Sequence, residues 1–195
     1  MRIRDKVKKP RRPVVLYEIL PPREKDGSLN SYAETISSLL SQTHIDGINI
    51  PEIRDEKRNG AKPVNSLSRA EPRKFGHLLQ DIVGVEAIIN RVVVHQPIKK
   101  ELEWVEETYD KYEIENFIIV GGESRKINYP GPTVNEALNK ISFDNKYHKK
   151  EIFCGGICIP RREKESSNII RKSRNGAEFF TTQVIYDSSK VIEML

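Results

Sequence analysis

Short apolar runs alternate with longer amphipathic segments along the chain. Runs rich in β-branched and aromatic residues predict six strands, at residues 14–20, 45–50, 89–98, 116–124, 151–160 and 178–187. Between them, apolar positions recur at helical spacing. The predicted helices cover residues 31–43, 70–81, 99–112, 133–141 and 163–175, and a last helix starts in the segment 188–195. The pattern is therefore a βα unit repeated six times.

Nearly continuous apolar strands belong to parallel sheets covered by helices, so the fold is either a doubly wound sheet or a barrel. In a barrel the carboxyl ends of all strands meet at one mouth, whereas in a doubly wound sheet only those near the switch point meet. Polar residues mark five of the six predicted strand ends: Glu18, Asn49, His95 with Gln96, Gly121–Gly122–Glu123, and Gln183. Polar residues at so many strand ends favour the barrel. We predict a (β/α)8 TIM-barrel type fold with six of its eight βα units present.

A complete barrel of this type takes about 250 residues, and the chain has 195. We expect a basic N-terminal segment at residues 1–12 and a single, incomplete barrel domain at residues 13–195. An open parallel sheet would expose two unpaired edges. Three explanations stay open: a shortened form of a longer protein, a second copy or partner chain that completes the barrel, or a natural short form that has lost activity.

The net charge of +5 raises the question of nucleic acid, since basic residues concentrate at 2–12, 161–162 and 171–174. No RNA-binding motif, zinc finger or aromatic–basic interleaving accompanies them, so a nucleic-acid partner is only the weakest alternative. A small anionic ligand, such as a cofactor phosphate or a glutamate tail, fits local clusters of this kind better.

The compartment follows from what the sequence lacks. No apolar run approaches the roughly 18–20 residues of a membrane span, and the N-terminus is too charged for a signal peptide. Cys154 and Cys158 are too few for a zinc site or a disulfide framework. We expect two buried, reduced thiols, no metal site, no membrane partner and a cytoplasmic location.

Glu18 is an ionisable residue inside the apolar run "VVLYEIL". Strand alternation places it on the same face as Val14 and Leu16. Burial among apolar side chains penalises an ionised carboxyl, so such a group can act as an acid near neutral pH. The alternative is an edge or interhelix carboxylate paired with a basic residue such as Arg23.

Four segments, in order along the chain, resemble the methylenetetrahydrofolate reductase family of (β/α)8 barrel enzymes. They are "YEILPPR" (17–23), "IIVGGES" (118–124), "NYPGPTVNEA" (128–137) and "NIIRKSRNGAEFFTTQ" (168–183). The resemblance covers nearly all of the chain from residue 13 onward. It implies reduction of methylenetetrahydrofolate to the methyl form, with NAD(P)H as the hydride source and FAD as the usual carrier.

By matching position, the resemblance gives Glu18 the role of the acid that protonates the folate ring nitrogen as the ring opens. Gln183 would hydrogen-bond the pterin, although a capping or interior hydrogen bond is the alternative for this amide. Asn49, His95 and Gln96 are candidates to line the mouth, and a structural role for the histidine is the alternative.

The flavin contacts implied by the resemblance are Gly122, Glu123, Asn168, Arg171 and Lys172. Arg171 and Lys172 could neutralise a diphosphate, or could form a solvated helix end favoured by the helix dipole. Glu123 replaces the aspartate usual in the family, and "GINIPEIRD" (47–55) lacks the family's Thr-Tyr-Gly-Ala stretch. Some relatives pass hydride directly from the nicotinamide, so both routes stay open.

The sequence therefore predicts a methylenetetrahydrofolate reductase-like oxidoreductase that acts on methylenetetrahydrofolate or a related pterin. The alternative is a noncatalytic folate-binding or assembly subunit whose barrel a partner chain completes.

Overall fold

The computed structural model of the chain describes residues 1–53, 69–122, 124 and 126–194. The chain forms two compact units. Unit 1 holds residues 1–90 and 107–116, and unit 2 holds residues 91–106 and 117–195.

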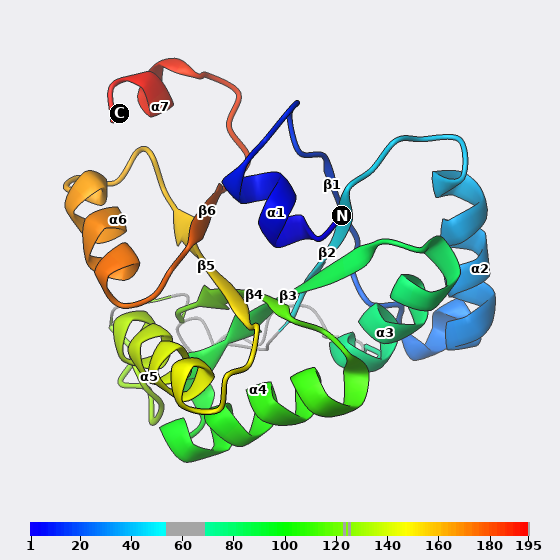
Figure 1. The fold of residues 1–195 in the computed structure, drawn as a ribbon, viewed down its shortest axis with the longest axis horizontal. Helices are drawn as coiled ribbons and strands as arrows, with labels where there is room; N and C mark the ends of the chain where they lie inside the picture. The colour runs from blue at the N-terminus through cyan, green and yellow to red at the C-terminus, as the bar shows by residue number, and fades with distance from the viewer. Residues whose placement is uncertain (54–68, 123, 125, 195) are drawn as a thin grey trace. The chain divides into compact units, whose positions relative to one another are not determined.

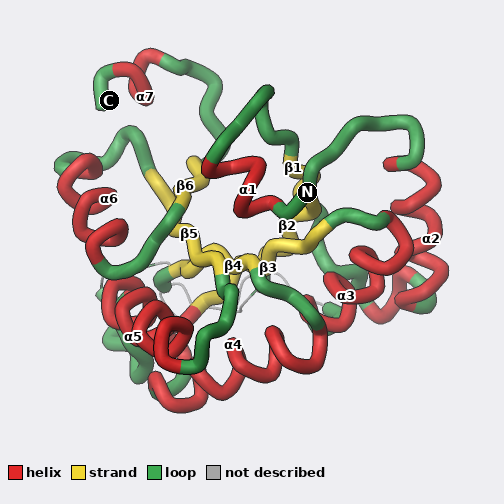
Figure 2. Tube along the Cα trace, in the orientation of Figure 1, coloured by secondary structure: helices red, strands yellow, loops and turns green. Residues whose placement is uncertain are grey.

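Strands and helices alternate along the described chain (Figure 2). The strands are β1 Leu16–Glu18, β2 Gly47–Pro51, β3 Glu86–Val92, β4 Asn116–Val120, β5 Phe153–Cys158 and β6 Phe179–Thr182. The helices are α1 Ile3–Lys8, α2 Leu29–Leu40, α3 Pro72–Val83, α4 Ile98–Tyr112, α5 Val134–Tyr147, α6 Glu165–Arg174 and α7 Ser189–Ile192. Short 3₁₀ turns lie at Glu24–Asp26 and Val93–His95.

The strands form one six-stranded sheet in the order β1-β2-β3-β4-β5-β6 (Figure 1). Pairing is parallel between β1 and β2, between β2 and β3, and between β5 and β6. Each strand thus lies beside its neighbour in sequence, without the reversal of order that defines a doubly wound sheet. The prediction of a TIM-barrel type fold with six βα units is confirmed.

The core of unit 1 lies between its sheet and α3. Gly76 of α3 faces the tips of Ile50 and Ile89, and a Cβ at that position would lie 3.2 Å from the Cδ1 atom of each. Phe75 and the isoleucines of β2 and β3 are fully buried: Ile48, Ile50, Ile88 and Ile89. Helix α2 packs beside α3, where the rings of Tyr32 and Phe75 lie 5.9 Å apart (Figure 1). The helix therefore lies close to the strands, and a side chain at position 76 would require these isoleucines to shift by a few tenths of an ångström.

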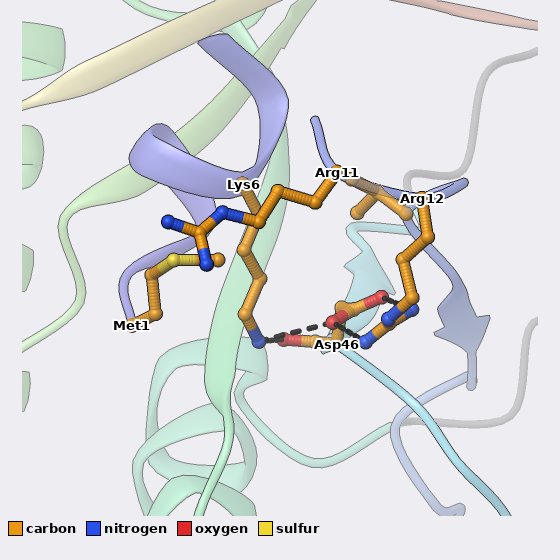
Figure 3. Close-up of a pocket in the computed structure, with 6 residues that line it drawn as sticks. Met1, Lys6, Arg11, Arg12 and Asp46 are labelled. Atoms are coloured by element: carbon orange, nitrogen blue, oxygen red, sulfur yellow. Dashed lines mark hydrogen bonds and ion pairs between the residues drawn. The ribbon is translucent and has the colours of Figure 1, made fainter. Parts of the chain in front are cut away.

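The basic N-terminal segment belongs to unit 1 and contains a helix, α1, that the sequence pattern did not predict. Ile3 is 1% exposed and its side chain lies against Gly47 of β2. Arg12 donates to both carboxylate oxygens of Asp46, at 2.9 and 2.8 Å, and the Lys6 ammonium lies 3.1 Å from the same carboxylate (Figure 3). The segment is therefore fastened to the start of β2 by one buried apolar side chain and one carboxylate.

Asp46 makes the stability of unit 1 sensitive to acid. The Arg12 hydrogen bond, helped by the Val15 N–H and by Lys6, holds the pKa of Asp46 well below its ordinary value of 3.8, although burial opposes this. A depressed folded-state pKa stabilises the fold above the unfolded pKa, and this stabilisation is lost as the pH falls below it. We expect the urea midpoint to fall between about pH 5 and about pH 2, and to fall less in Asp46→Asn. Parallel declines in the two proteins would contradict this assignment.

In unit 2, α6 packs against β5, and α5 packs against α6. Thr133 and Glu136 form a reciprocal capping box at the start of α5, which satisfies two N–H groups that the helix leaves open. The rings of Phe153 and Phe179 stack at 4.7 Å between neighbouring strands. Gly155 lies under the Phe179 ring, where a Cβ would overlap it. Both cysteines are buried and free, as predicted.

Several predicted element ends are wrong. The strand expected at 14–20 is only Leu16–Glu18, and the strand expected at 178–187 is only Phe179–Thr182. Both lie at the ends of the strand order, so among the described strands each has a ladder partner on one side only. The strand expected at 89–98 begins at Glu86 and gives way to a 3₁₀ turn at Val93. Beside β1 and β6 the apolar pattern runs on through exposed residues, such as Val15, Val184 and Tyr186, so an apolar run alone does not mark where a ladder ends.

Candidate functional site

One face of the sheet in unit 1 becomes polar toward its carboxyl end. The parallel register aligns Glu18 with Asn49, and Asn90 stands two residues beyond the β3 residue aligned with Asn49. Residues aligned in this way, and residues two apart on one strand, point to the same face. The other face carries Ile50 and Ile89, which pack on α3. The polar residues therefore occupy the face that α3 does not cover.

Glu18 and Asn49 are directly hydrogen-bonded: Asn49 Nδ2 donates to Glu18 Oε2 at 2.7 Å. Asn49 is 8% exposed. Among the residues that the structure describes, the buried Oδ1 atoms of Asn49 and Asn90 have no hydrogen-bond partner. Leaving a buried acceptor without a donor costs about 1–3 kcal/mol. Two such oxygens and a carboxylate make this face an acceptor-rich site, which a ligand carrying N–H groups would satisfy.

The burial that the sequence pattern predicts for Glu18 is wrong. Its side chain is exposed, and Leu16, on the same face of β1, is only half-buried. β1 stands at the end of the strand order, so strand alternation alone does not supply a cover for this face. Within the described residues no ion pair joins Glu18 to a basic side chain, and its hydrogen-bond partner is the amide of Asn49. The alternative considered for Glu18, a pairing with a basic residue such as Arg23, is therefore absent among these residues as well.

The residues that follow β3 and β4 meet in unit 2. His95 is half-buried, and its ring makes an edge contact with Tyr129, with 5.5 Å between ring centroids. Tyr129 also covers Gly122, where a Cβ would overlap its ring, and accepts a hydrogen bond from the Ser124 N–H at 3.3 Å. Gln96, beside His95, is half-buried too. Glycine at 122 thus serves the packing of Tyr129.

Glu165 organises the α6 residues for which the family resemblance implies contact with a flavin. It is 2% exposed and accepts from Asn168 Nδ2 at 3.0 Å. Lys172 lies 3.8 Å from Glu165 and donates to the backbone oxygen of Ile157. Burial lowers the pKa of Lys172, and the charge of Glu165 opposes that shift. Only Arg171 of the three predicted contacts is exposed, and it donates to Asn168 Oδ1 at 2.9 Å.

Gln183 and Glu123 are the two remaining predicted residues. Gln183 directly follows β6 and is exposed. Glu123 lies outside the described residues. The proposed roles of both residues in ligand binding stay predictions.

Two polar residues of these clusters were missed by sequence reasoning. Asn90 stands within "IINRVVV", where alternation in phase with Asn49 could have placed it on the polar face. Glu165 is an acidic residue in the first turn of a helix, a position that the helix dipole favours. Neither signal by itself distinguishes a buried acceptor from a solvated side chain.

In the part of the chain that the structure describes, no three His, Cys, Asp or Glu side chains gather where they could hold a metal ion. None of the described helices has both the length and the apolar character needed to cross a bilayer.

The chain matches no protein-family model and no curated protein sequence. Its fold is similar to that of an uncharacterized protein from Clostridium thermocellum that binds two copies of 5-methyl-5,6,7,8-tetrahydrofolic acid. The TM-score is 0.74 at 18% identity, over 98% of this chain and 62% of that one. It is also similar to 2,3-dimethylmalate lyase, a member of the PEP mutase/isocitrate lyase superfamily, with TM-score 0.64 and 12% identity over 98% and 66% of the two chains.

A third similar structure is N-acetylneuraminate lyase from Fusobacterium nucleatum, with TM-score 0.52 and 11% identity over 87% and 54% of the two chains. These likenesses establish the fold alone. The chain spans less than two thirds of the length of each of these proteins. The resemblance to methylenetetrahydrofolate reductases stays a prediction.

Proposed function

We propose that the chain binds a reduced folate on the polar face of unit 1, through Glu18, Asn49 and Asn90. The observation that carries the proposal is the buried Asn49 Oδ1, which has no donor among the described residues although its own amide is held by Glu18. The pterin ring of a folate carries N–H groups that fit an acceptor and a carboxylate side by side. Folate binding by the Clostridium thermocellum protein of similar fold supports the same ligand class.

The reaction we propose is reduction of methylenetetrahydrofolate to methyltetrahydrofolate. Glu18 in its protonated form gives its proton to the ring nitrogen, the bond from that nitrogen to the methylene carbon opens, and a hydride from NAD(P)H completes the methyl group. One proton and one hydride are consumed, and NAD(P)⁺ is the oxidised product. Because Glu18 is exposed in the chain alone, the proposal requires the bound folate to exclude water from the carboxyl group.

The described residues predicted to hold FAD do not form a site ready for it. Asn168 and Lys172 are engaged with Glu165 and the β5 backbone, and Tyr129 covers Gly122. Arg171 alone presents a cation to solvent. The proposed mechanism therefore takes no step through a flavin, and FAD binding stays a prediction from the resemblance.

The exposure of Glu18 favours a second candidate, a folate-binding or assembly subunit without turnover. In that case a partner chain or a second copy would extend the sheet at β1 and β6, which end the strand order. Both candidates predict folate binding. Only the first predicts oxidation of NADH or NADPH that depends on methylenetetrahydrofolate.

The binding proposal predicts that Asn49→Leu weakens the affinity for 5-methyltetrahydrofolate by about tenfold, since a neutral hydrogen bond contributes about 0.5–1.5 kcal/mol. Titration calorimetry of the purified chain measures this. Leucine has the same number and branching of side-chain heavy atoms as asparagine, so the buried face stays filled. Asn30→Leu, at an exposed position of α2, is the matched control and should bind like the parent protein. Equal affinity in both variants, or no binding by the parent, removes Asn49 from the proposed site.

A further inference from the structure

A cavity of about 190 Å³ opens at the amino end of β1 and β2, in unit 1 (Figure 3). Its lining residues come from α1, from the segments before and after that helix, and from the residue before β2: Met1, Lys6, Arg11, Arg12, Val14 and Asp46. Three of these side chains are cations and one is an anion. The remaining two are apolar.

Asp46 cannot balance the three cations. Its carboxylate is 1% exposed and is held by Arg12, by Lys6 and by the Val15 N–H, at 2.9 Å for the last. Since Arg12 and these neighbours hold the pKa of Asp46 well below its ordinary value, it carries one negative charge at physiological pH. Its charge therefore offsets one of the three cations, and the cavity keeps an excess of two positive charges.

Arg11 is the cation of this cavity whose N–H groups are free to bind a ligand. It is exposed, and it forms no hydrogen bond or ion pair within the described residues. Figure 3 shows its guanidinium turned toward Met1, while Lys6 and Arg12 reach Asp46 from other directions. A guanidinium offers paired N–H donors in a plane, which suits two oxygens of one oxyanion. The Lys6 ammonium, 3.1 Å from the Asp46 carboxylate, adds a second positive charge to the lining of the cavity.

We propose that this cavity binds the phosphate group of a small phosphomonoester. Arg11 donates hydrogen bonds to two phosphate oxygens, and Lys6 neutralises a further charge. Met1 and Val14 provide apolar surface for the carbon that bears the ester. A phosphomonoester carries nearly two negative charges at neutral pH, which equals the excess charge of the cavity.

The cavity is separate from the proposed folate site. Asp46 lies before the first residue of β2 and Asn49 lies three residues later, a distance of about 10 Å along a strand. The two sites lie at opposite ends of the strands, and barrel enzymes carry out their chemistry at the carboxyl ends. The phosphate site is therefore independent of the proposed reaction.

The experiment is a calorimetric titration of the full chain with inorganic phosphate, glycerol 3-phosphate and succinate at low and moderate salt. We expect one saturable site for the two phosphates. Arg11→Gln should weaken it tenfold or more, because a charge-assisted hydrogen-bond pair is lost. Arg174→Gln removes a charge from an exposed helix end in unit 2 and should leave the affinity unchanged.

Three outcomes would overturn the proposal. The first is no saturable binding, and the second is equal weakening by both variants, which would indicate general charge attraction. The third is tighter binding of succinate than of glycerol 3-phosphate, which would mark a dicarboxylate site instead. Arg11 has no partner within the described residues, so Arg11→Gln should keep the fold and the parent affinity for 5-methyltetrahydrofolate. The folate proposal is thereby tested separately.

Discussion

Replacing Glu18 by glutamine is expected to lower the rate of methylenetetrahydrofolate reduction by roughly 100- to 10,000-fold, the usual contribution of a positioned general acid. Glutamine keeps the size of the side chain and can still hydrogen-bond Asn49, whose amide now lies 2.7 Å from the carboxylate. It has no acidic proton to give to the folate nitrogen. Affinity for 5-methyltetrahydrofolate should change much less than the rate. The measurement is NADH or NADPH oxidation at saturating methylenetetrahydrofolate, together with a calorimetric dissociation constant.

Glu34→Gln is the control, since Glu34 is an exposed carboxylate on α2 in the same unit. It should react at the parent rate. Near-normal turnover in Glu18→Gln removes Glu18 from the mechanism. Folate binding by the parent protein with no turnover from NADH, NADPH or reduced flavin removes the reductase reaction and leaves the noncatalytic candidate.

The largest stability effect is expected at Arg91 in unit 2. Its guanidinium donates to both oxygens of Glu101, at 2.8 and 3.0 Å, and lies 4.2 Å from the centre of the Trp104 ring. Arg91 is 1% exposed and Glu101 is fully buried. Arg91→Met would leave a buried carboxylate without its cation, at a cost of about 3–5 kcal/mol in unfolding free energy. Urea denaturation followed by Trp104 fluorescence measures the loss.

The double variant Arg91→Met/Glu101→Leu distinguishes the cost of the unpaired buried charge from the cost of lost packing. Replacing both ions by apolar groups of similar volume is often close to neutral, so the double variant should be more stable than Arg91→Met. The control is the exposed pair Lys99–Glu103 on α4, the helix that carries Glu101. Both ions of this pair stay hydrated, so Lys99→Met should change the unfolding free energy little. A single variant as stable as the parent would show that the carboxylate is compensated by other groups.

Much of the fold could be predicted because it depends on local pattern. Apolar runs and helical spacing gave six βα units, and turn and cap residues such as Thr133 fix where helices begin whatever surrounds them. The ends of β1 and β6 could not be predicted in this way. A ladder needs a neighbouring strand, and the presence of that neighbour is a property of the sheet.

The candidate site likewise has features that the sequence predicts and features that depend on the tertiary structure. The sequence predicts the position of Glu18 and of Asn49 toward the carboxyl ends of their strands. The parallel register then brings the two together, because it aligns Glu18 with Asn49. The exposure of Glu18 could not be predicted from the sequence, since it depends on which other parts of the fold cover its face of the sheet. Likewise the orphaned oxygen of Asn90 depends on which donors the folded chain brings near it.

The sequence by itself thus determined the order of elements, the barrel-type sheet and the strand ends at which polar groups collect. Only the tertiary structure decided which charges meet. Arg12 and Lys6 reach Asp46 from 34 and 40 residues away, and Arg91 meets Glu101 across a turn. Local spacing carries no information on such pairs, because charge attraction and burial are fixed by distances that exist only once the strands have been brought together.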